Sequence, residues 1–206
     1  RQRDFIYVDI SDGIGSGVIV GGKFFRGSNG FAGEIGYMFS TPQEMNKNSL
    51  IQTKGFLEQH ASIEAIKKQV VEAVKQGEPS IVLQCSNNNV NDISSSTIFE
   101  CAYSGDEVSR NIIGHAVELL GQAIMNIILV MDPKEVVLGG DIFMMPYVNE
   151  LVLKPISEYL QEVVPYEVPK LMLSSLGADA CLIGASIAGA EALLSGLYPF
   201  RLEGKN

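Results

Sequence analysis

Residues 5–25 read FIYVDISDGIGSGVIVGGKFF and carry the clearest structural pattern in this chain. The first six residues are short, mostly apolar and rich in β-formers, as expected of a central strand. Residues 18–20 and 23–25 flank Gly21-Gly22, which is typical of a hairpin because a type I′ turn needs positive φ at both central residues. The stretch predicts three antiparallel strands, with a Gly-rich turn at residues 11–17 after the first.

The rest of the chain alternates between helical and strand-like patterns. Helical spacing covers residues 57–75, and shorter helices are expected at 93–103 and 146–163. The S-x-x-E sequence at Ser104 to Glu107 predicts a capping box that opens a long helix to about Met131. Short strands are expected at 81–85, 135–138 and 171–173, and a closely packed Ala/Gly-rich helix at 184–197. This order predicts a mixed α/β sheet with right-handed crossovers.

Composition excludes several classes of protein. The 206 residues carry a net charge of −9 and are 46% hydrophobic, which is typical of one large globular domain. That charge repels polyphosphates, so this chain alone is a poor nucleic-acid binder. The most apolar stretch, residues 112–131, contains four polar side chains, which favours a buried helix over a membrane span.

The three cysteines are Cys85, Cys101 and Cys181, and no CxxC pair occurs among them. A sparse, odd count favours buried thiols in a reducing compartment over a disulfide framework. The two histidines are interpreted as packing residues: His60 as a surface or packing side chain, and His115 as a satisfied core residue.

The Gly-rich turn contains Asp12, Gly13 and Gly15, and exposed N–H groups in such a turn can cradle a phosphate. Two considerations weaken that interpretation. Short glycine motifs match by chance, so the glycines could simply shape the bend, and the Asp12 carboxylate would repel a phosphate.

Two glutamates are candidates for binding hydroxyl groups. Glu34 follows Gly33 on a Gly-rich loop, where a carboxylate can accept hydrogen bonds from paired hydroxyls such as those of a sugar ring. Glu58 lies near a predicted helix N-terminus, where the helix dipole favours its charge. The alternatives are a solvated loop glutamate and a glutamate placed only for the dipole.

Several segments in register resemble the ROK family (repressor, open reading frame, kinase). They are residues 12–17, 22–27, 33–36, 55–62, 126–140 and 176–185, and the similarity covers nearly the whole chain. The resemblance implies a lobe of the actin-like, ribonuclease-H-like ATPase fold. Residues 1–206 would then be a single C-terminal lobe with a long loop region at 27–56, and the upstream lobe and any helix-turn-helix would be absent from this chain.

The departures from the family pattern concern catalysis and metal binding. Family kinases use an Asp in an upstream Asn-Asp motif that this chain lacks, and they usually have Gly-Thr-Gly where this chain has Ser-Asp-Gly at 11–13. The family's zinc site uses one His and three Cys; here Tyr37, Ser49, Ile51 and Phe56 stand in those positions. We therefore expect a degenerate phosphate loop, no cofactor (neither ATP nor zinc), and mobility over residues 36–56.

The resemblance places Glu34 and Glu58 at sugar-contacting positions, with Tyr37 and Gly33 beside them. It implies a non-catalytic, sugar-sensing effector domain of a bacterial, cytoplasmic, xylose-repressor-like transcriptional regulator. Its partners would be a sugar and further copies of itself, with no membrane, and DNA only through a missing N-terminal domain. The alternatives are a fragment or degenerate relative of an ATP-dependent, glucokinase-like sugar kinase, and a sugar-independent interaction module.

Overall fold

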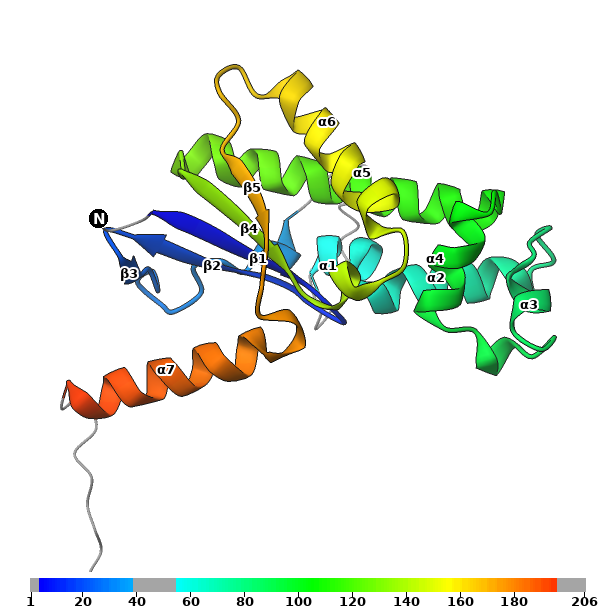
Figure 1. The fold of residues 1–206 in the computed structure, drawn as a ribbon, viewed down its shortest axis with the longest axis horizontal. Coiled ribbons are helices and arrows are strands. Elements are labelled where there is room, and N and C mark those ends of the chain that lie inside the picture. The colour runs from blue at the N-terminus through cyan, green and yellow to red at the C-terminus, as the bar shows by residue number, and fades with distance from the viewer. Residues whose placement is uncertain (1–3, 39–54, 196–206) are drawn as a thin grey trace, which may run out of the picture.

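The computed structural model describes residues 4–38 and 55–195. Its sheet has the strand order β3-β2-β1-β4-β5 (Figure 1). The strands are β1 (Phe5–Ile10), β2 (Ile14–Val20), β3 (Lys23–Phe24), β4 (Glu135–Gly139) and β5 (Lys170–Leu173). The pairs β1–β2 and β2–β3 are antiparallel, whereas β1–β4 and β4–β5 are parallel. The three antiparallel N-terminal strands and the mixed α/β sheet are confirmed.

The alternation of β1 decides which face of the sheet is covered. Ile6, Val8 and Ile10 are buried beneath helices, and the residues between them are half-buried on the other face. The hairpin between β2 and β3 closes at Gly21-Gly22 with φ of +58° and +74°, as the Gly-Gly signal predicted.

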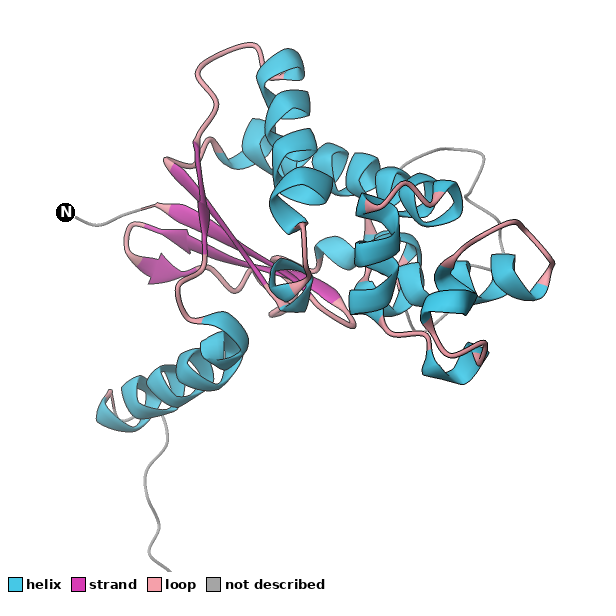
Figure 2. Ribbon diagram, turned by 45° about the vertical axis from the view of Figure 1, so that its right-hand side comes forward, coloured by secondary structure: helices cyan, strands magenta, loops and turns pink. Residues whose placement is uncertain are grey.

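Helices accompany the sheet and, apart from α7, cover its buried face and extend beyond it (Figure 2). They are α1 (Phe56–Ala61), α2 (Ile63–Lys75), α3 (Val82–Cys85), α4 (Ser95–Tyr103), α5 (Glu107–Met131), α6 (Lys154–Val163) and α7 (Ala180–Leu194), with short helical turns η1 (Ile35–Tyr37), η4 (Val90–Asp92), η5 (Asp141–Met144), η6 (Asn149–Leu153) and η7 (Gly177–Asp179). The central helix α5 packs against α1, α2, α4 and α6. By length and hydropathy α5 could cross a membrane, but more than half of its most apolar stretch is buried in this core.

Several expected elements differ from the structure. The helix expected at 57–75 is broken at Ser62, which ends α1 and caps α2: its buried hydroxyl accepts the Ala65 N–H at 3.1 Å. The expected strand at 81–85 is wrong, because residues 82–85 form the short helix α3.

The capping-box prediction is also wrong in detail. The residue that caps α5 is Asp106, whose carboxylate accepts the Ser109 N–H at 3.0 Å. Ser104 instead ends α4, and its hydroxyl donates to the Glu100 carbonyl at 2.9 Å. An acceptor nearer to the first helical turn takes the capping role.

Helix α7 begins earlier than expected and is not closely packed. None of its residues is buried, and Leu182 and Leu194 are 69% and 89% exposed. In Figures 1 and 2 it extends away from the sheet and the other helices. The prediction of a packed helix therefore fails within the described residues.

Three single-residue predictions also fail. His115 lies on the exposed side of α5, 3.9 Å from the Glu118 carboxylate, and is not a core residue. Cys85 and Cys181 are exposed, and only Cys101 is buried. An apolar helix still has an outer face, so apolar neighbours in the sequence do not fix the burial of one residue.

Candidate functional site

The turn between β1 and β2 is fixed by a network that begins on β1. Tyr7, Asp9 and Ser11 alternate onto one face of the strand: the Tyr7 hydroxyl donates to Asp9 Oδ2 at 3.1 Å and the Ser11 hydroxyl to Asp9 Oδ1 at 2.9 Å. Ser11 Oγ in turn accepts the Asp141 N–H at 3.0 Å, which ties the turn to the end of β4. Burial and the neighbouring Asp9 raise the pKa of Tyr7 to about 12. The sequence reading overlooked this network, although the i, i+2 spacing of a strand could have indicated it.

Glu58, in the first turn of α1, reaches the Gly-rich turn. Its Oε2 accepts the Ile14 N–H at 3.2 Å, and a Cβ at Gly13 would lie 3.0 Å from the same oxygen. Gly13 therefore provides the space for the Glu58 carboxylate. Gly15 has open space around its Cβ position, and Asp12 is exposed.

Glycines also bring η1 against α1 and the turn. A Cβ at Gly36 would lie 2.6 Å from the Ile14 carbonyl oxygen and 3.5 Å from Glu58 Oε2, and a Cβ at Gly55 would lie 2.1 Å from the Gly36 carbonyl oxygen. Gly33, with φ of +95°, accepts hydrogen bonds from the Ser16 N–H at 2.8 Å and the Ser16 hydroxyl at 3.0 Å. These contacts leave no room for side chains, so the backbone segments pack directly together.

The sequence-predicted sugar residues lie on these packed elements. Glu34 precedes η1 and Tyr37 ends it, with Gly36 between them against Glu58. Glu34 and Tyr37 are exposed and Glu58 is half-buried. In the described part of the chain no group bonds to the Glu34 carboxylate, whereas Tyr37 does have a partner. The arrangement offers carboxylate oxygens as acceptors to a ligand rich in hydroxyl donors.

The phosphate-loop residues lie at the same place. The turn has Asp12 at its exposed side and the Glu58 carboxylate bonded to the N–H of Ile14. Two carboxylates next to a short run of N–H groups disfavour a bound phosphate, because like charges repel.

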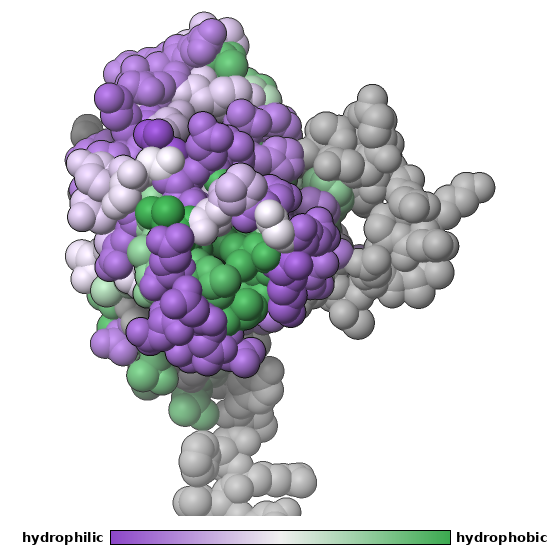
Figure 3. All heavy atoms as spheres, turned by 90° about the vertical axis from the view of Figure 1, so that its right-hand side faces the viewer, coloured by the Kyte–Doolittle hydropathy of each residue, from purple (hydrophilic) through white to green (hydrophobic). Residues whose placement is uncertain are grey.

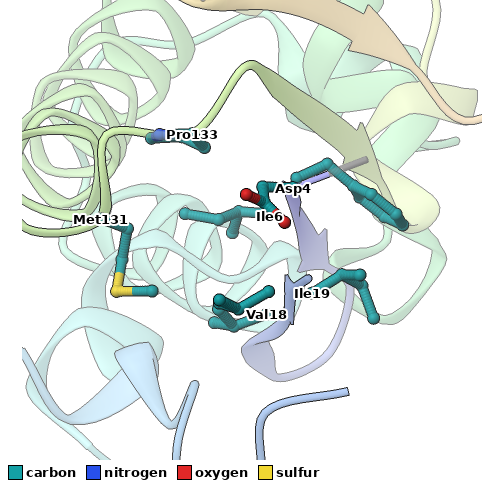
Figure 4. Close-up of a pocket in the computed structure, with 8 residues that line it drawn as sticks. Asp4, Ile6, Val18, Ile19, Met131 and Pro133 are labelled. Carbon is teal, nitrogen blue, oxygen red and sulfur yellow. The ribbon is translucent and has the colours of Figure 1, made fainter. Parts of the chain in front are cut away.

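Two cavities lie elsewhere. A small apolar pocket of about 90 Å³ is formed at the other end of β1, lined by Asp4, Ile6, Val18, Met131 and Pro133 among others (Figure 4). A groove of about 410 Å³ runs between α2 and the start of α5. Figure 3 looks at that end of the molecule and shows apolar side chains in a hollow surrounded by polar ones. Neither cavity includes Glu34, Tyr37 or Glu58.

The zinc positions are described only in part. Tyr37 is exposed at the end of η1, and Phe56 is buried and stacks on the ring of His60 at 4.1 Å between centroids. His60 Nδ1 lies 2.8 Å from the Phe56 carbonyl oxygen, which agrees with a packing histidine. Ser49, Ile51 and most of the segment expected to be mobile fall outside the described residues. Within residues 4–38 and 55–195, no three metal-ligating side chains cluster.

Comparisons with known proteins agree with this architecture. The chain is 29% identical over 187 residues to the xylose repressor of Caldicellulosiruptor bescii, covering 89% of this chain and 45% of that protein. It is 26% identical over 189 residues to the glucokinase of Halalkalibacterium halodurans, covering 88% and 54%. The chain thus spans about half the length of these curated relatives.

The solved structure of a ROK hexokinase from Thermus thermophilus superimposes with a TM-score of 0.72 at 26% identity, over 93% of this chain and 59% of that one. Its fold and the mixed sheet described above are those of the actin-like sugar kinases. The family model described as "ROK family" matches residues 1–191, which include the Gly-rich turn, both candidate glutamates and most of α7. This protein therefore belongs to the ROK family.

Proposed function

We propose that this chain is the C-terminal, sugar-sensing lobe of a ROK-type transcriptional repressor and performs no catalysis. The observation that carries the proposal is the Glu58 carboxylate on the Ile14 N–H, with Asp12 beside it, at the turn where a kinase would hold phosphate. This arrangement favours a hydroxyl-rich ligand over a nucleotide. The similarity to a xylose repressor supports it.

The exposure of α7 supports the interpretation as one lobe of a larger protein. A helix that is apolar on all sides is normally buried, yet no residue of α7 is buried by the described part of this chain. A second lobe would supply a covering surface and the other half of a sugar cleft. DNA binding through an N-terminal domain, assembly into oligomers, a cytoplasmic location and the absence of zinc and ATP belong to the same proposal.

Glu34 and Glu58 would bind adjacent sugar hydroxyls in this proposal. A charge-assisted hydrogen bond of this kind contributes about 1.5–3 kcal/mol. Glu58→Gln keeps a side-chain carbonyl oxygen that can accept the Ile14 N–H and removes the charge, so the protein should still fold. Glu158→Gln, at an exposed position on α6, is the matched control.

The test is calorimetric titration of D-xylose and D-glucose into the complete gene product. We expect one of the two to bind, Glu34→Gln and Glu58→Gln each to weaken binding roughly tenfold or more, and Glu158→Gln to leave it unchanged. Normal binding by either candidate variant would remove that glutamate from the site. Because half of the cleft would be absent, the 206-residue chain alone should bind weakly or not at all.

A sugar kinase is the second candidate, and the similarity to a glucokinase favours it. The two candidates differ in one measurable property: a kinase releases ADP from ATP in a sugar-dependent way, and a repressor does not. Sugar-dependent ADP release by the complete gene product would replace the repressor proposal with this one. Specific DNA binding that a sugar reverses would support the repressor.

A further inference from the structure

An exposed loop between β3 and η1 carries the only Asn-Gly pair in the sequence, Asn29-Gly30. Every residue from 21 to 31 is exposed. Gly30 has φ of +80°, and the position of its missing Cβ faces open space. Among the residues that the structure describes, neither the Gly30 N–H nor the Asn29 side-chain amide has a hydrogen-bond partner. Both groups are therefore available for chemistry.

The loop is closed at its base and open at its tip. The Ala32 N–H donates to the Arg26 carbonyl oxygen at 3.2 Å, and a Cβ at Gly27 would lie 3.2 Å from the Ala32 Cβ. Residues 28–30 lie beyond this closure and form an exposed turn. The tip can thus change its backbone angles while the bond at the base stays in place.

An asparagine is labile when the backbone nitrogen of the next residue can reach its side-chain carbon. A glycine in that next position leaves the nitrogen unobstructed, because it has no Cβ and its backbone takes many conformations. Other asparagines are placed less favourably. Asn111 and Asn126 lie within α5, where helical hydrogen bonds fix the backbone, and Asn89 is followed by the β-branched Val90.

We propose that Asn29 is a site of spontaneous deamidation in the folded protein, with aspartate and isoaspartate as its products. The Gly30 backbone nitrogen loses its proton and attacks Cγ of Asn29, a C–N bond forms, and the side-chain nitrogen takes up a proton and leaves as ammonia. One water molecule then opens the resulting cyclic imide. Opening at Cγ gives aspartate, and opening at the Asn29 backbone carbonyl gives isoaspartate. Overall one amide is hydrolysed, and nothing is oxidised or reduced.

Either product adds one negative charge to a chain whose net charge is −9. Isoaspartate also routes the backbone through the side chain and lengthens it by one atom between Gly27 and Gly33. The Gly33 carbonyl accepts the Ser16 hydroxyl, and the candidate ligand Glu34 comes next in the chain. The modification thus falls in the segment that leads to one candidate sugar-binding carboxylate. An effect on sugar binding would rest on the proposed function, whereas the deamidation itself does not.

The experiment incubates the 206-residue protein at mildly alkaline pH, in the folded state and in guanidinium chloride, and follows each asparagine by peptide mapping with mass spectrometry. We expect Asn29 of the folded protein to be converted before any other described asparagine. The rate should rise with pH, because the attacking nitrogen must lose its proton. A protein isoaspartyl methyltransferase should transfer labelled methyl groups from S-adenosylmethionine to the isoaspartate product. Conversion in guanidinium chloride without conversion in the folded protein would overturn the proposal, because the loop would then protect Asn29.

Three variants separate Asn-Gly chemistry from general lability. Gly30→Ala should slow the conversion of Asn29 several-fold, since the added methyl group crowds the attacking nitrogen. Asn29→Gln, at an exposed position that should tolerate it, should remove the more acidic species from isoelectric focusing over the same period. Asn88→Gln changes an exposed asparagine that is followed by Asn89, and it should leave the conversion of Asn29 unchanged. Equal rates at Asn29 with and without Gly30→Ala, or faster conversion of Asn88 than of Asn29, would contradict the proposal.

Discussion

Asp106 connects the start of α5 to the segment before α3, and its removal gives the sharpest test of the fold. The residue is 6% exposed. Its carboxylate accepts from the Ser109 N–H at 3.0 Å and hydroxyl at 2.7 Å, the Ile81 N–H at 2.8 Å and the Ser80 hydroxyl at 3.1 Å. One side chain thus caps the central helix and holds a segment that precedes it by 25 residues.

Asp106→Ala removes the cap and leaves several donors without their acceptor. Loss of an N-cap costs about 1 kcal/mol, and a buried donor left unpaired costs roughly 1–3 kcal/mol. The half-exposed segment at 80–81 regains water, so the lower part of that range applies, and we expect a total of about 3 kcal/mol. For a chain of this length that corresponds to a fall in Tm of roughly 6–12 °C.

Urea unfolding followed by circular dichroism measures this loss. Asp92→Ala, which removes an exposed carboxylate on η4, is the control and should change the free energy of unfolding by less than about 0.5 kcal/mol. If Asp106→Ala costs less than about 1 kcal/mol, or no more than the control, the carboxylate does not hold these segments together.

The same residue predicts a dependence of stability on pH. Burial by itself would raise the pKa of Asp106, but the hydrogen bonds from Ser109, Ile81 and Ser80 outweigh it and lower the pKa below its usual 3.8. A lowered folded-state pKa contributes stability above the unfolded-state value and loses it as pH falls through the folded value. Below about pH 4 the wild-type protein should therefore lose stability more steeply than Asp106→Asn. Parallel pH profiles for the two proteins would refute this assignment.

Three other measurements follow from the structure. Gly33→Ala should lower the free energy of unfolding by more than about 2 kcal/mol, because its Cβ would lie 2.0 Å from the Ser16 carbonyl oxygen at φ of +95°. Gly30→Ala, at φ of +80° in open space, should lower it less. Equal urea midpoints for the two variants would contradict the steric argument. The pKa of Tyr7 is raised to about 12, so the stability that its protonated hydroxyl contributes is complete below pH 10 and is lost between pH 10 and 12. The free energy of unfolding of Tyr7→Phe should therefore fall less steeply than that of the wild-type protein in this window. The 206-residue chain should bind the dye ANS through α7, and Ile187→Glu should lower the fluorescence without changing Tm.

The sequence predicted those elements whose signals are local. The Gly21-Gly22 hairpin, the strand at 5–10 and the long central helix all depend on propensity and spacing within one segment. Residues 81–85 failed because a short apolar run does not distinguish a strand from a helix. The conformation of this segment depends on Asp106, whose carboxylate accepts the Ile81 N–H from 25 residues away in the sequence.

The sequence named the residues of the candidate site but not their geometry, and their binding of a sugar stays a prediction. Glu34 and Glu58 were named from their loop and helix positions and from the family resemblance, and the structure places Glu34 directly before η1 and Glu58 on α1, which packs against η1. That arrangement depends on contacts at Gly13, Gly36 and Gly55, where backbone or carboxylate atoms fill the space of a missing side chain. Only the folded chain shows which distant segment each glycine meets.

Glu58 belongs to the candidate sugar site and also contacts the Gly-rich turn. One of its oxygens accepts the Ile14 N–H of the Gly-rich turn, so under the proposed function the other oxygen would accept a hydrogen bond from a sugar hydroxyl. A ligand that draws the carboxylate toward itself would lengthen the bond to Ile14, and the turn is tied through Ser11 to the N–H of Asp141 after β4. Under this proposal, sugar binding at Glu58 would shift the backbone at the ends of β1 and β4. In the repressor that we propose, this link would provide a physical route from a bound effector to the rest of the chain.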